Sequence, residues 1–392
     1  MSTSVIVAGA RTPIGKLSGA LGGFTAMQLG GFAIAAALER AGVSPEDVDV
    51  VLMGQVLQAG QGQITARQAA VLGGIPMTVH ATTVNKVCLS GLNTIYLADL
   101  LIRAGEAEVV VAGGMESMTQ APHLLKGVRA GYRLGDATLI DSMMLDGLTC
   151  AFDQCAMGLS TERHNQGRIT RERQDAFSAA SHEKAAAAIK NGQLADEIVP
   201  VEVPQRKGDP LVVDTDEGVR PGTTAESLGA LRPAFDPEGT ITAGNASQIS
   251  DGGAAVVVMA ADRARAAGVP VLGELVAYGQ VAGPDASLLS QPARAIAAAL
   301  ARASLTVRDL DLVEINEAFA AVGLQSADEL GLDEAKLNVN GGAIALGHPV
   351  GMSGTRLALT ALHELHRRGG GTAAVALCGG GGQGDAAVLC TA

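Results

Sequence analysis

The stretch "AIAAALERAGVSPEDVDVVLMGQ" (33–55) returns late in the chain as "AIAAALARASLTVRDLDLVEINE" (295–317). The two stretches align without gaps, and roughly half of their positions are identical. Many of the remaining positions exchange Val, Leu and Ile. A repeat with so long a period is unlike the short units of solenoid proteins, so it predicts two related domains.

The duplication continues beyond these two stretches. "VNKVCLSGLNTIYLADLLIRAGEAEVVVAGG" (84–114) resembles, with small gaps, the segment 339–380, which contains "VNGGAIALGHPVGMSG" and "LALTALHELHRRGGGTAAVALCGG". Each half therefore offers a helix, a strand, a reactive corner, a second helix, and a strand that runs into a glycine turn.

Short β-branched runs alternate with Ala-rich helical patterns along the chain, which predicts an α/β fold. The runs are continuous and apolar, as in strands of parallel sheets that helices cover on both faces. They occupy residues 4–9, 48–53, 107–114, 254–260, 310–316 and 371–378.

The segment 119–248 differs in composition from the rest of the chain, because it is richer in His, Arg, Asp and Pro and poorer in β runs. Long inserts of this kind usually carry function. We therefore expect an N-terminal core domain at 1–118, completed by 249–269, an inserted loop domain at 119–248, and a C-terminal core domain at 270–392.

Composition excludes several classes of protein. The net charge of −12 and the absence of Trp argue against a nucleic-acid partner, which needs clustered cations and stacking aromatics. No stretch approaches 18 uninterrupted apolar residues, and the N-terminus lacks a basic n-region, so we expect neither a membrane span nor a signal peptide. The five cysteines are irregularly spaced and fit neither a disulfide framework nor a metal site. Reduced thiols predict a cytoplasmic location.

Two phosphate-binding signals fail on inspection. "GARTPIGK" (9–16) has five residues between its glycines, and Leu17 stands where a P-loop needs Ser or Thr. "GGGGQG" (379–384) is followed by "DAAVLCTA", which does not form the helix that a dinucleotide site requires. We interpret this second run as a strand, a turn and a strand.

Cys88 lies between a β-leaning run and a well-patterned helix at 89–104. A thiol at a helix N-terminus feels free N–H groups and the positive end of the dipole, so we expect a lowered pKa and a nucleophilic role. The competing interpretation is a small buried hydrophobe, the commoner fate of a lone cysteine.

Three further segments carry candidate chemistry. His348 lies in the Gly-rich loop "NVNGGAIALGHPVGMSG" (338–354), although a turn with an incidental His is also typical there. Asn316 stands where a strand passes into a helix. An Asn in this place is most often an N-cap, and it can equally orient a water or an imidazole. Cys378 ends a strand and enters four glycines, whose bare N–H groups could bind an oxyanion.

A thiol paired with an imidazole makes a covalent nucleophile. A hydrolase uses water as its second reactant and needs only one thiol. A second thiol beside an anion site is therefore unusual for a hydrolase. A thiol that acts as a base suits the removal of a weakly acidic proton next to a thioester carbonyl. The set points to acyl transfer between thiols with formation or cleavage of a carbon–carbon bond.

The motifs "NKVCLSG", "NEAFA", "GGAIALGHP" and "CGGGGQG" together resemble those of the thiolase family, most closely the short-chain biosynthetic type. The resemblance covers essentially the whole chain. It implies a five-layer αβαβα fold with two duplicated core domains and an inserted loop domain. It also implies interconversion of two acetyl-CoA with acetoacetyl-CoA and CoA, a role in fatty acid metabolism, and a homotetramer built as a dimer of dimers.

By this resemblance Cys88 is the acylated nucleophile, His348 its activating base, and Cys378 the acid/base for the second acetyl-CoA. Asn316 would hold a water that forms one oxyanion hole with His348, and the N–H groups of Cys88 and Gly380 would form the other. The family uses CoA as substrate and product, without a tightly bound cofactor or metal.

The resemblance also implies coenzyme A contacts through the inserted region and its junction with the core. The matching positions are Leu148, Met157, Arg220, Ser227, Phe235, Ala243, Ser247, Ala318 and Phe319. Arg220 would lie near the nucleotide end, although a solvated surface arginine is an equal alternative, and Ser247 would contact the pantetheine. The run "DQCAMG" (153–158) departs from the family pattern, with Ala156 at the usual His position, which leaves acyl preference open.

Three alternatives remain at this point. A 3-ketoacyl-CoA thiolase of broader chain length would share all four catalytic residues. A Cys–His–Asn hydrolase would not need Cys378. A non-catalytic acyl-CoA carrier on the same fold would be expected to have lost Cys88 or His348, and both are present.

Overall fold

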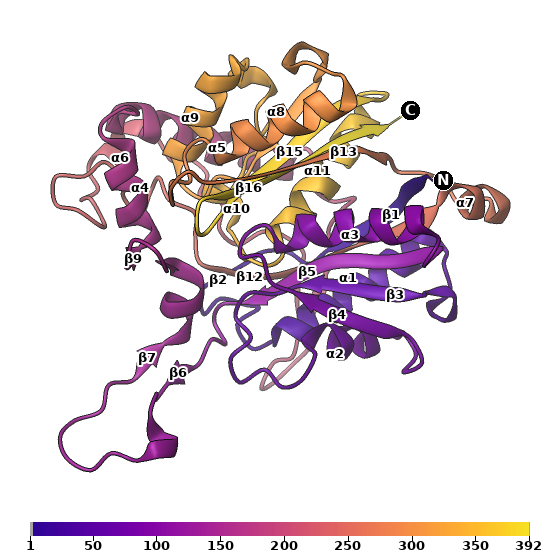
Figure 1. Cartoon of the computed structure of the whole chain (residues 1–392), viewed down its shortest axis with the longest axis horizontal. Helices are drawn as coiled ribbons and strands as arrows, with labels where there is room; N and C mark the ends of the chain where they lie inside the picture. The colour runs from indigo at the N-terminus through magenta and orange to yellow at the C-terminus, as the bar shows by residue number, and fades with distance from the viewer. Residues whose placement is uncertain (1–2, 392) are drawn as a thin grey trace.

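The computed structural model of the chain describes residues 3–391. Two sheets lie one above the other in Figure 1, the N-terminal sheet below and the C-terminal sheet above, with the inserted region beside them. Both chain halves thus contribute one sheet each, as the repeat predicts.

The N-terminal sheet has the strand order β1-β12-β5-β3-β4, and the short β2 (Gly15–Lys16) pairs with β12. β5, β3 and β4 run parallel, whereas β12 pairs antiparallel with both β1 and β5. The strands are β1 (Ser4–Arg11), β3 (Val50–Gly54), β4 (His80–Val84), β5 (Val109–Ser117) and β12 (Ser250–Ala260).

The C-terminal sheet has the order β13-β16-β15-β14. Only β14 and β15 run parallel. β15 turns directly into β16 without the crossover that a parallel pair requires, so these two strands are antiparallel, and β13 is also antiparallel to β16. The prediction of parallel sheets is therefore wrong, since both sheets are mixed. The strands are β13 (Glu274–Ala282), β14 (Leu312–Ile315), β15 (Gly371–Gly379) and β16 (Gln383–Thr391).

Helices complete five layers, so the αβαβα prediction is confirmed (Figure 1). α8 covers the outer face of the C-terminal sheet, and α1 and α2 cover the outer face of the N-terminal sheet. Between the sheets lie α3 and α11, whose buried leucines and isoleucines pack against both. The bounds are α1 (Ala26–Ala41), α2 (Thr65–Leu72), α3 (Ser90–Ala104), α8 (Gln291–Ala303) and α11 (Ser353–Arg367).

The repeated stretches adopt the same order of elements. Residues 33–55 cover most of α1, the 3-10 turn η1 (Pro45–Asp47) and β3, while 295–317 cover most of α8, η4 (Val307–Asp309) and β14. α3 and α11 then occupy corresponding places in the two halves. The remaining core elements are α7 (Ala261–Ala267), α9 (Ala320–Leu330), η5 (Glu334–Lys336) and α10 (Ala343–Leu346).

The inserted region contains an extended arm and a small helical body. The arm is built on the hairpin β6 (His123–Leu124) and β7 (Ile140–Asp141) and projects at the lower left of Figure 1. The other elements are η2 (Val128–Ala130), the π-helix η3 (Met143–Leu148), β8 (Thr149–Cys150), β9 (Cys155–Ala156), α4 (Met157–Asn165), α5 (Arg171–Lys190), β10 (Val201–Val203), β11 (Leu211–Val213) and α6 (Ala225–Gly229).

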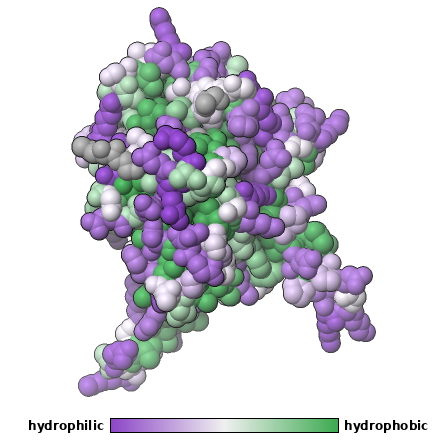
Figure 2. Space-filling model, turned by 90° about the vertical axis from the view of Figure 1, so that its right-hand side faces the viewer, coloured by the Kyte–Doolittle hydropathy of each residue, from purple (hydrophilic) through white to green (hydrophobic). Residues whose placement is uncertain are grey.

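One window, Val87–Ala104, is long and apolar enough to cross a membrane by length and composition. More than half of it is buried, and it contains α3, which packs against β5, β3 and α11 in the middle layer. We therefore interpret it as a core helix. On the molecular face drawn in Figure 2, hydrophilic and hydrophobic residues are interspersed.

Candidate active site

The first turns of α3 and α11 meet in the middle layer because each helix has glycine as its second residue. A side chain on Gly91 would clash with Thr355, and one on Gly354 would clash with Leu92. Thr355 Oγ1 donates a hydrogen bond of 2.9 Å to Gly91 O and fixes the crossing. Since Cys88 precedes α3 and His348 precedes α11, this contact brings the two corners together.

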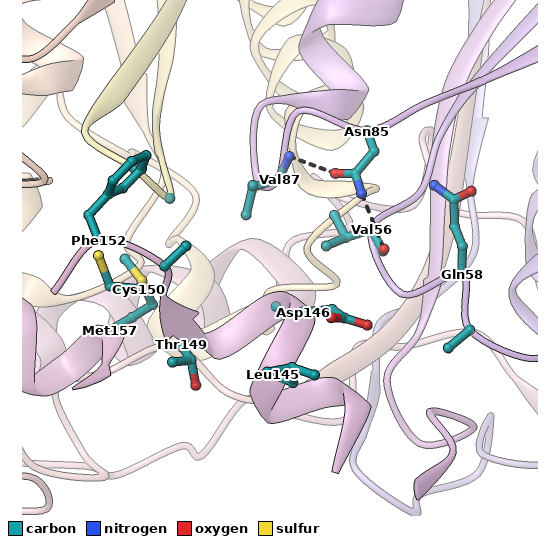
Figure 3. Close-up of a pocket in the computed structure, with 15 residues that line it drawn as sticks. Val56, Gln58, Asn85, Val87, Leu145, Asp146, Thr149, Cys150, Phe152 and Met157 are labelled. Carbon is teal, nitrogen blue, oxygen red and sulfur yellow. Dashed lines mark hydrogen bonds between the residues drawn. The ribbon is translucent and has the colours of Figure 1, made fainter. Parts of the chain in front are cut away.

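The Cys88 corner is held by short-range hydrogen bonds. Ser90 Oγ donates to Val87 O at 2.6 Å and accepts from Lys86 N at 2.8 Å. Asn85 Oδ1 accepts from Val87 N at 3.0 Å, and Asn85 Nδ2 reaches Val56 O (Figure 3). Val87 adopts φ of 52°, a left-handed conformation that a β-branched residue keeps only when its surroundings enforce it.

A cavity of about 60 Å³ collects most of the predicted catalytic residues. Cys88 and His348 line it together with Cys378 and Gly380 from the β15–β16 hairpin. Asn316 does not line this cavity, but its Nδ2 lies 3.3 Å from His348 Nε2 at the end of β14. The structure thus brings all five residues to one place.

The hydrogen bonds of His348 determine its tautomer. Ser353 Oγ lies 2.6 Å from His348 Nδ1 and donates its own proton to Pro349 O at 3.0 Å. Nδ1 therefore carries the ring proton and donates to Ser353, because a hydroxyl has one proton. Nε2 is therefore unprotonated and accepts a hydrogen bond from Asn316 Nδ2, and an unprotonated nitrogen is what a base requires.

Burial controls the protonation of the site. Burial, aided by the nearby Arg356, lowers the pKa of His348 to about 3, so the imidazole is neutral near pH 7. Burial also raises the pKa of Cys88 to about 12, although the backbone N–H groups of Cys88 and Gly380 act in the opposite sense. The pKa of Cys378 is likewise raised by burial and by the Cys88 sulfur.

The expectation of a lowered Cys88 pKa is therefore wrong. The helix terminus stabilises the thiolate, but the loss of water around the sulfur is the larger effect. Both partners are neutral at rest, and the proton would move to Nε2 only as the sulfur attacks.

Two family models match the chain. The thiolase N-terminal domain matches residues 4–262, and the thiolase C-terminal domain matches residues 269–391. The chain belongs to the thiolase family.

Curated thiolase relatives match over nearly the whole chain. The "Probable acetyl-CoA acetyltransferase" of Mycolicibacterium smegmatis is 60% identical, with 98% of this chain and 100% of that protein covered. The protein of the same name from Mycobacterium tuberculosis is 59% identical, with 99% of each chain covered. The "Acetyl-CoA acetyltransferase" of Cupriavidus necator is 52% identical, with 98% of each covered.

Most of the predicted coenzyme A positions of this thiolase surround the catalytic cavity. Five line the cavity itself: Leu148, Met157, Ser247, Ala318 and Phe319. Ser247 N donates to Ala318 O at 3.0 Å, which joins the inserted region to the C-terminal core.

A larger cavity of about 360 Å³ adjoins the first. Phe235 and Ala243 line it, and so does Ala156, at the position where this thiolase departs from the family pattern. Phe235 packs edge-on against Phe319 with centroids 6.3 Å apart, so the walls are mainly apolar. A cavity of this size with apolar walls suits a slender chain such as pantetheine.

Arg220 and Ser227 line neither cavity, and both are exposed. Arg220 N donates to His182 Nδ1 at 3.2 Å. Ser227 Oγ donates to Thr224 O in the capping box of α6. Their predicted contacts with coenzyme A stay predictions.

Sequence reasoning missed two supporting residues. Ser353 fixes the His348 tautomer, and its only signal was a serine in "HPVGMSG" five residues after the histidine. Glu116 accepts hydrogen bonds from the N–H groups of Val56, Leu57 and Gly351, and burial raises its pKa to about 7. Nothing in the pattern around Glu116 singles it out.

Proposed function

We propose that this thiolase is an acetyl-CoA acetyltransferase that interconverts two acetyl-CoA with acetoacetyl-CoA and CoA. The observation that carries the proposal is the single cavity shared by Cys88, His348, Cys378 and Gly380. The names of the relatives support the same reaction.

In the first step the Cys88 thiol passes its proton to His348 Nε2 as the sulfur attacks the acetyl carbonyl carbon. The carbon–sulfur bond to CoA then breaks, and the CoA thiolate takes the proton from His348. One thioester replaces another, so the exchange is nearly neutral in free energy. The N–H groups of Cys88 and Gly380, which both act on this sulfur, would stabilise the oxyanion.

In the second step Cys378 passes its thiol proton to the neutral His348, and the Cys378 thiolate removes a proton from the methyl group of a second acetyl-CoA. The resulting carbanion attacks the acetyl carbon on Cys88, a carbon–carbon bond forms, the bond to the Cys88 sulfur breaks, and the departing Cys88 thiolate takes the proton from His348. Asn316, through a water, and His348 would stabilise the enolate oxygen. The buried Asn316 Oδ1, which has no protein partner within residues 3–391, supports a bound water there.

Acetyl specificity is favoured over the broader 3-ketoacyl-CoA alternative by the size of the cavity at the sulfurs. A volume of about 60 Å³ equals that of roughly two waters in the liquid, which suits an acetyl group. The larger adjoining cavity would hold the pantetheine of CoA, against Leu148, Met157 and Ser247. Arg220, which is exposed, would attract the nucleotide phosphates.

We further propose a cytoplasmic homotetramer that serves fatty acid metabolism, and the domain division at 118, 248 and 269. The projecting arm supports assembly, because its tip carries exposed apolar residues such as Leu134, which is 99% exposed. The odd number of free cysteines supports a reducing compartment.

The test is to incubate the enzyme with labelled acetyl-CoA and to follow two readouts. Acetyl mass is expected on the peptide that contains Cys88, and acetoacetyl-CoA is expected in the supernatant. Labelling with release of acetate alone would identify a hydrolase, and binding without labelling would identify a carrier. Either result would overturn the proposal.

A further inference from the structure

Lys86 and Asp385 form an ion pair that crosses from one half of the chain to the other. Lys86 Nζ lies 2.8 Å from both carboxylate oxygens of Asp385. The Asp385 side chain is 1% exposed and that of Lys86 is 21% exposed. The proposed reaction uses neither residue, although Lys86 stands two positions before the nucleophile.

The ion pair joins the two segments that supply the proposed oxyanion hole. Lys86 belongs to the corner that presents Cys88, where Ser90 and Asn85 hold the backbone. Asp385 follows the β15–β16 turn, and it pairs with Leu377 in the sheet, next to Cys378. The bond therefore spans from the nucleophile to the hairpin that carries the second sulfur and Gly380.

Asp385 is itself fixed in place. Tyr278 Oη donates to Asp385 Oδ2 at 2.8 Å, and burial raises the pKa of Tyr278 well above its usual range, so the phenol keeps its proton. The Tyr278 ring stacks on Tyr96 of α3 with centroids 4.2 Å apart and planes 3° apart. The carboxylate is thus a rigid anchor.

The Cys88 corner and the β15–β16 hairpin are in contact with each other close to the ion pair. A side chain on Gly379 would clash with Leu89, and one on Gly380 would contact the methyl groups of Val87 at 3.4 Å. Val87 holds a left-handed conformation that costs of order 1–3 kcal/mol unless contacts enforce it. Without a tether, the corner could relax and move away from the N–H of Gly380.

We propose that Lys86 and Asp385 are positioning residues that hold the Cys88 sulfur against the backbone N–H of Gly380. The inference rests on the proposed covalent role of Cys88. The pair acts through geometry: its two charges neutralise each other, and neither touches the reacting atoms. A misplacement of about 1 Å at such a site can cost roughly 100-fold in rate.

The experiment compares Lys86→Met with Arg103→Met as a matched control. The control pair, Arg103 and Asp99 on α3, also joins a partly exposed cation to a buried carboxylate, with side chains 41% and 7% exposed. Its carboxylate likewise accepts from a hydroxyl, Ser4 Oγ. A purely structural role predicts the same outcome for both variants.

Two readouts separate positioning from stability. We expect Lys86→Met to lower kcat for acetyl transfer by roughly 10- to 100-fold with KM within about twofold. Alkylation of Cys88 by iodoacetamide at pH 8, followed on its peptide, should slow by about tenfold, because loss of one hydrogen bond to a thiolate raises its pKa by roughly one unit. Glu116, the titratable group that acts on the Cys88 thiol, and Cys378, whose own pKa the Cys88 sulfur raises, stay in place in every variant.

Asp385→Asn is the second variant, and it keeps an acceptor for Tyr278 if Lys86→Met folds poorly. Positioning predicts slower alkylation in both variants, whereas a direct effect of the Lys86 charge predicts faster alkylation in Asp385→Asn. Faster alkylation in Asp385→Asn would overturn the proposal. So would losses of kcat and of alkylation rate in Arg103→Met equal to those in Lys86→Met. The alkylation readout does not depend on turnover, so it stays informative even if the acetyltransferase reaction proves wrong.

Discussion

Replacing Ser353 with alanine should weaken the base without touching the substrate. In the native site His348 Nδ1–H donates to Ser353 Oγ, which keeps Nε2 unprotonated and able to accept a proton. The variant leaves Nδ1–H without an acceptor in a buried place. The other tautomer would direct Nε2–H at the amide N–H of Asn316, so either arrangement loses a hydrogen bond.

An unsatisfied buried donor costs about 1–3 kcal/mol, which corresponds to roughly 5- to 150-fold in a step that needs Nε2 as acceptor. We expect kcat for acetyl loading of Cys88 to fall by this factor. KM should change little, because Ser353 is buried and lines no substrate cavity. The measurement is the pre-steady-state rate of Cys88 acetylation at saturating acetyl-CoA.

The matched control is Ser178→Ala. Ser178 is equally buried and donates to the carbonyl four residues before it, Gln174 O, at 2.8 Å, as Ser353 does to Pro349 O. It should lose stability but not acetylation rate. The tautomer argument is refuted if Ser353→Ala acetylates within twofold of the native rate, or if Ser178→Ala is slowed as much.

Three other predictions follow from the site and the arm. Cys378→Ala should still acquire an acetyl group on Cys88 by peptide mass, yet form no acetoacetyl-CoA; full condensation activity would remove Cys378 from the mechanism. The lowered folded pKa of His348, about 3 against 6.5 unfolded, means that stability is lost as pH falls through this window. From pH 6.5 to 5.0 this histidine should cost roughly 1–2 kcal/mol in urea unfolding, and His348→Asn should show a correspondingly shallower pH dependence. Leu134→Asp should shift the assembly to a smaller species in analytical ultracentrifugation, and an unchanged mass would exclude a role of the arm tip in association.

The layered fold could be predicted because each repeat contains strong local signals. Residues 33–55 and 295–317 both pair an Ala-rich helix with a short β-branched strand, and those elements form where expected. Strand direction was harder to predict. β12 reaches the N-terminal sheet from the inserted region and β16 from a tight turn, so both lie antiparallel despite runs as apolar as those of parallel strands.

The protonation of the site depends on contacts that no local pattern encodes. The sequence around Cys88 correctly places a thiol near a helix terminus, which alone would lower its pKa. The structure adds the loss of water around the sulfur and the nearby Glu116 carboxyl, and these reverse the direction. Lys86 and Asp385 lie almost 300 residues apart, so their bond could not be inferred from one sequence.

The duplication explains how one pocket acquires two different reactive groups. α3 and α11 are corresponding helices, and both lie in the middle layer with their first turns in contact. The corner before each helix must therefore face the same space. The corner before α3 supplies a thiol, Cys88, and the longer loop before α11 supplies an imidazole, His348. Since each corner is braced by its own serine, Ser90 or Ser353, the nucleophile and the base can be adjusted independently.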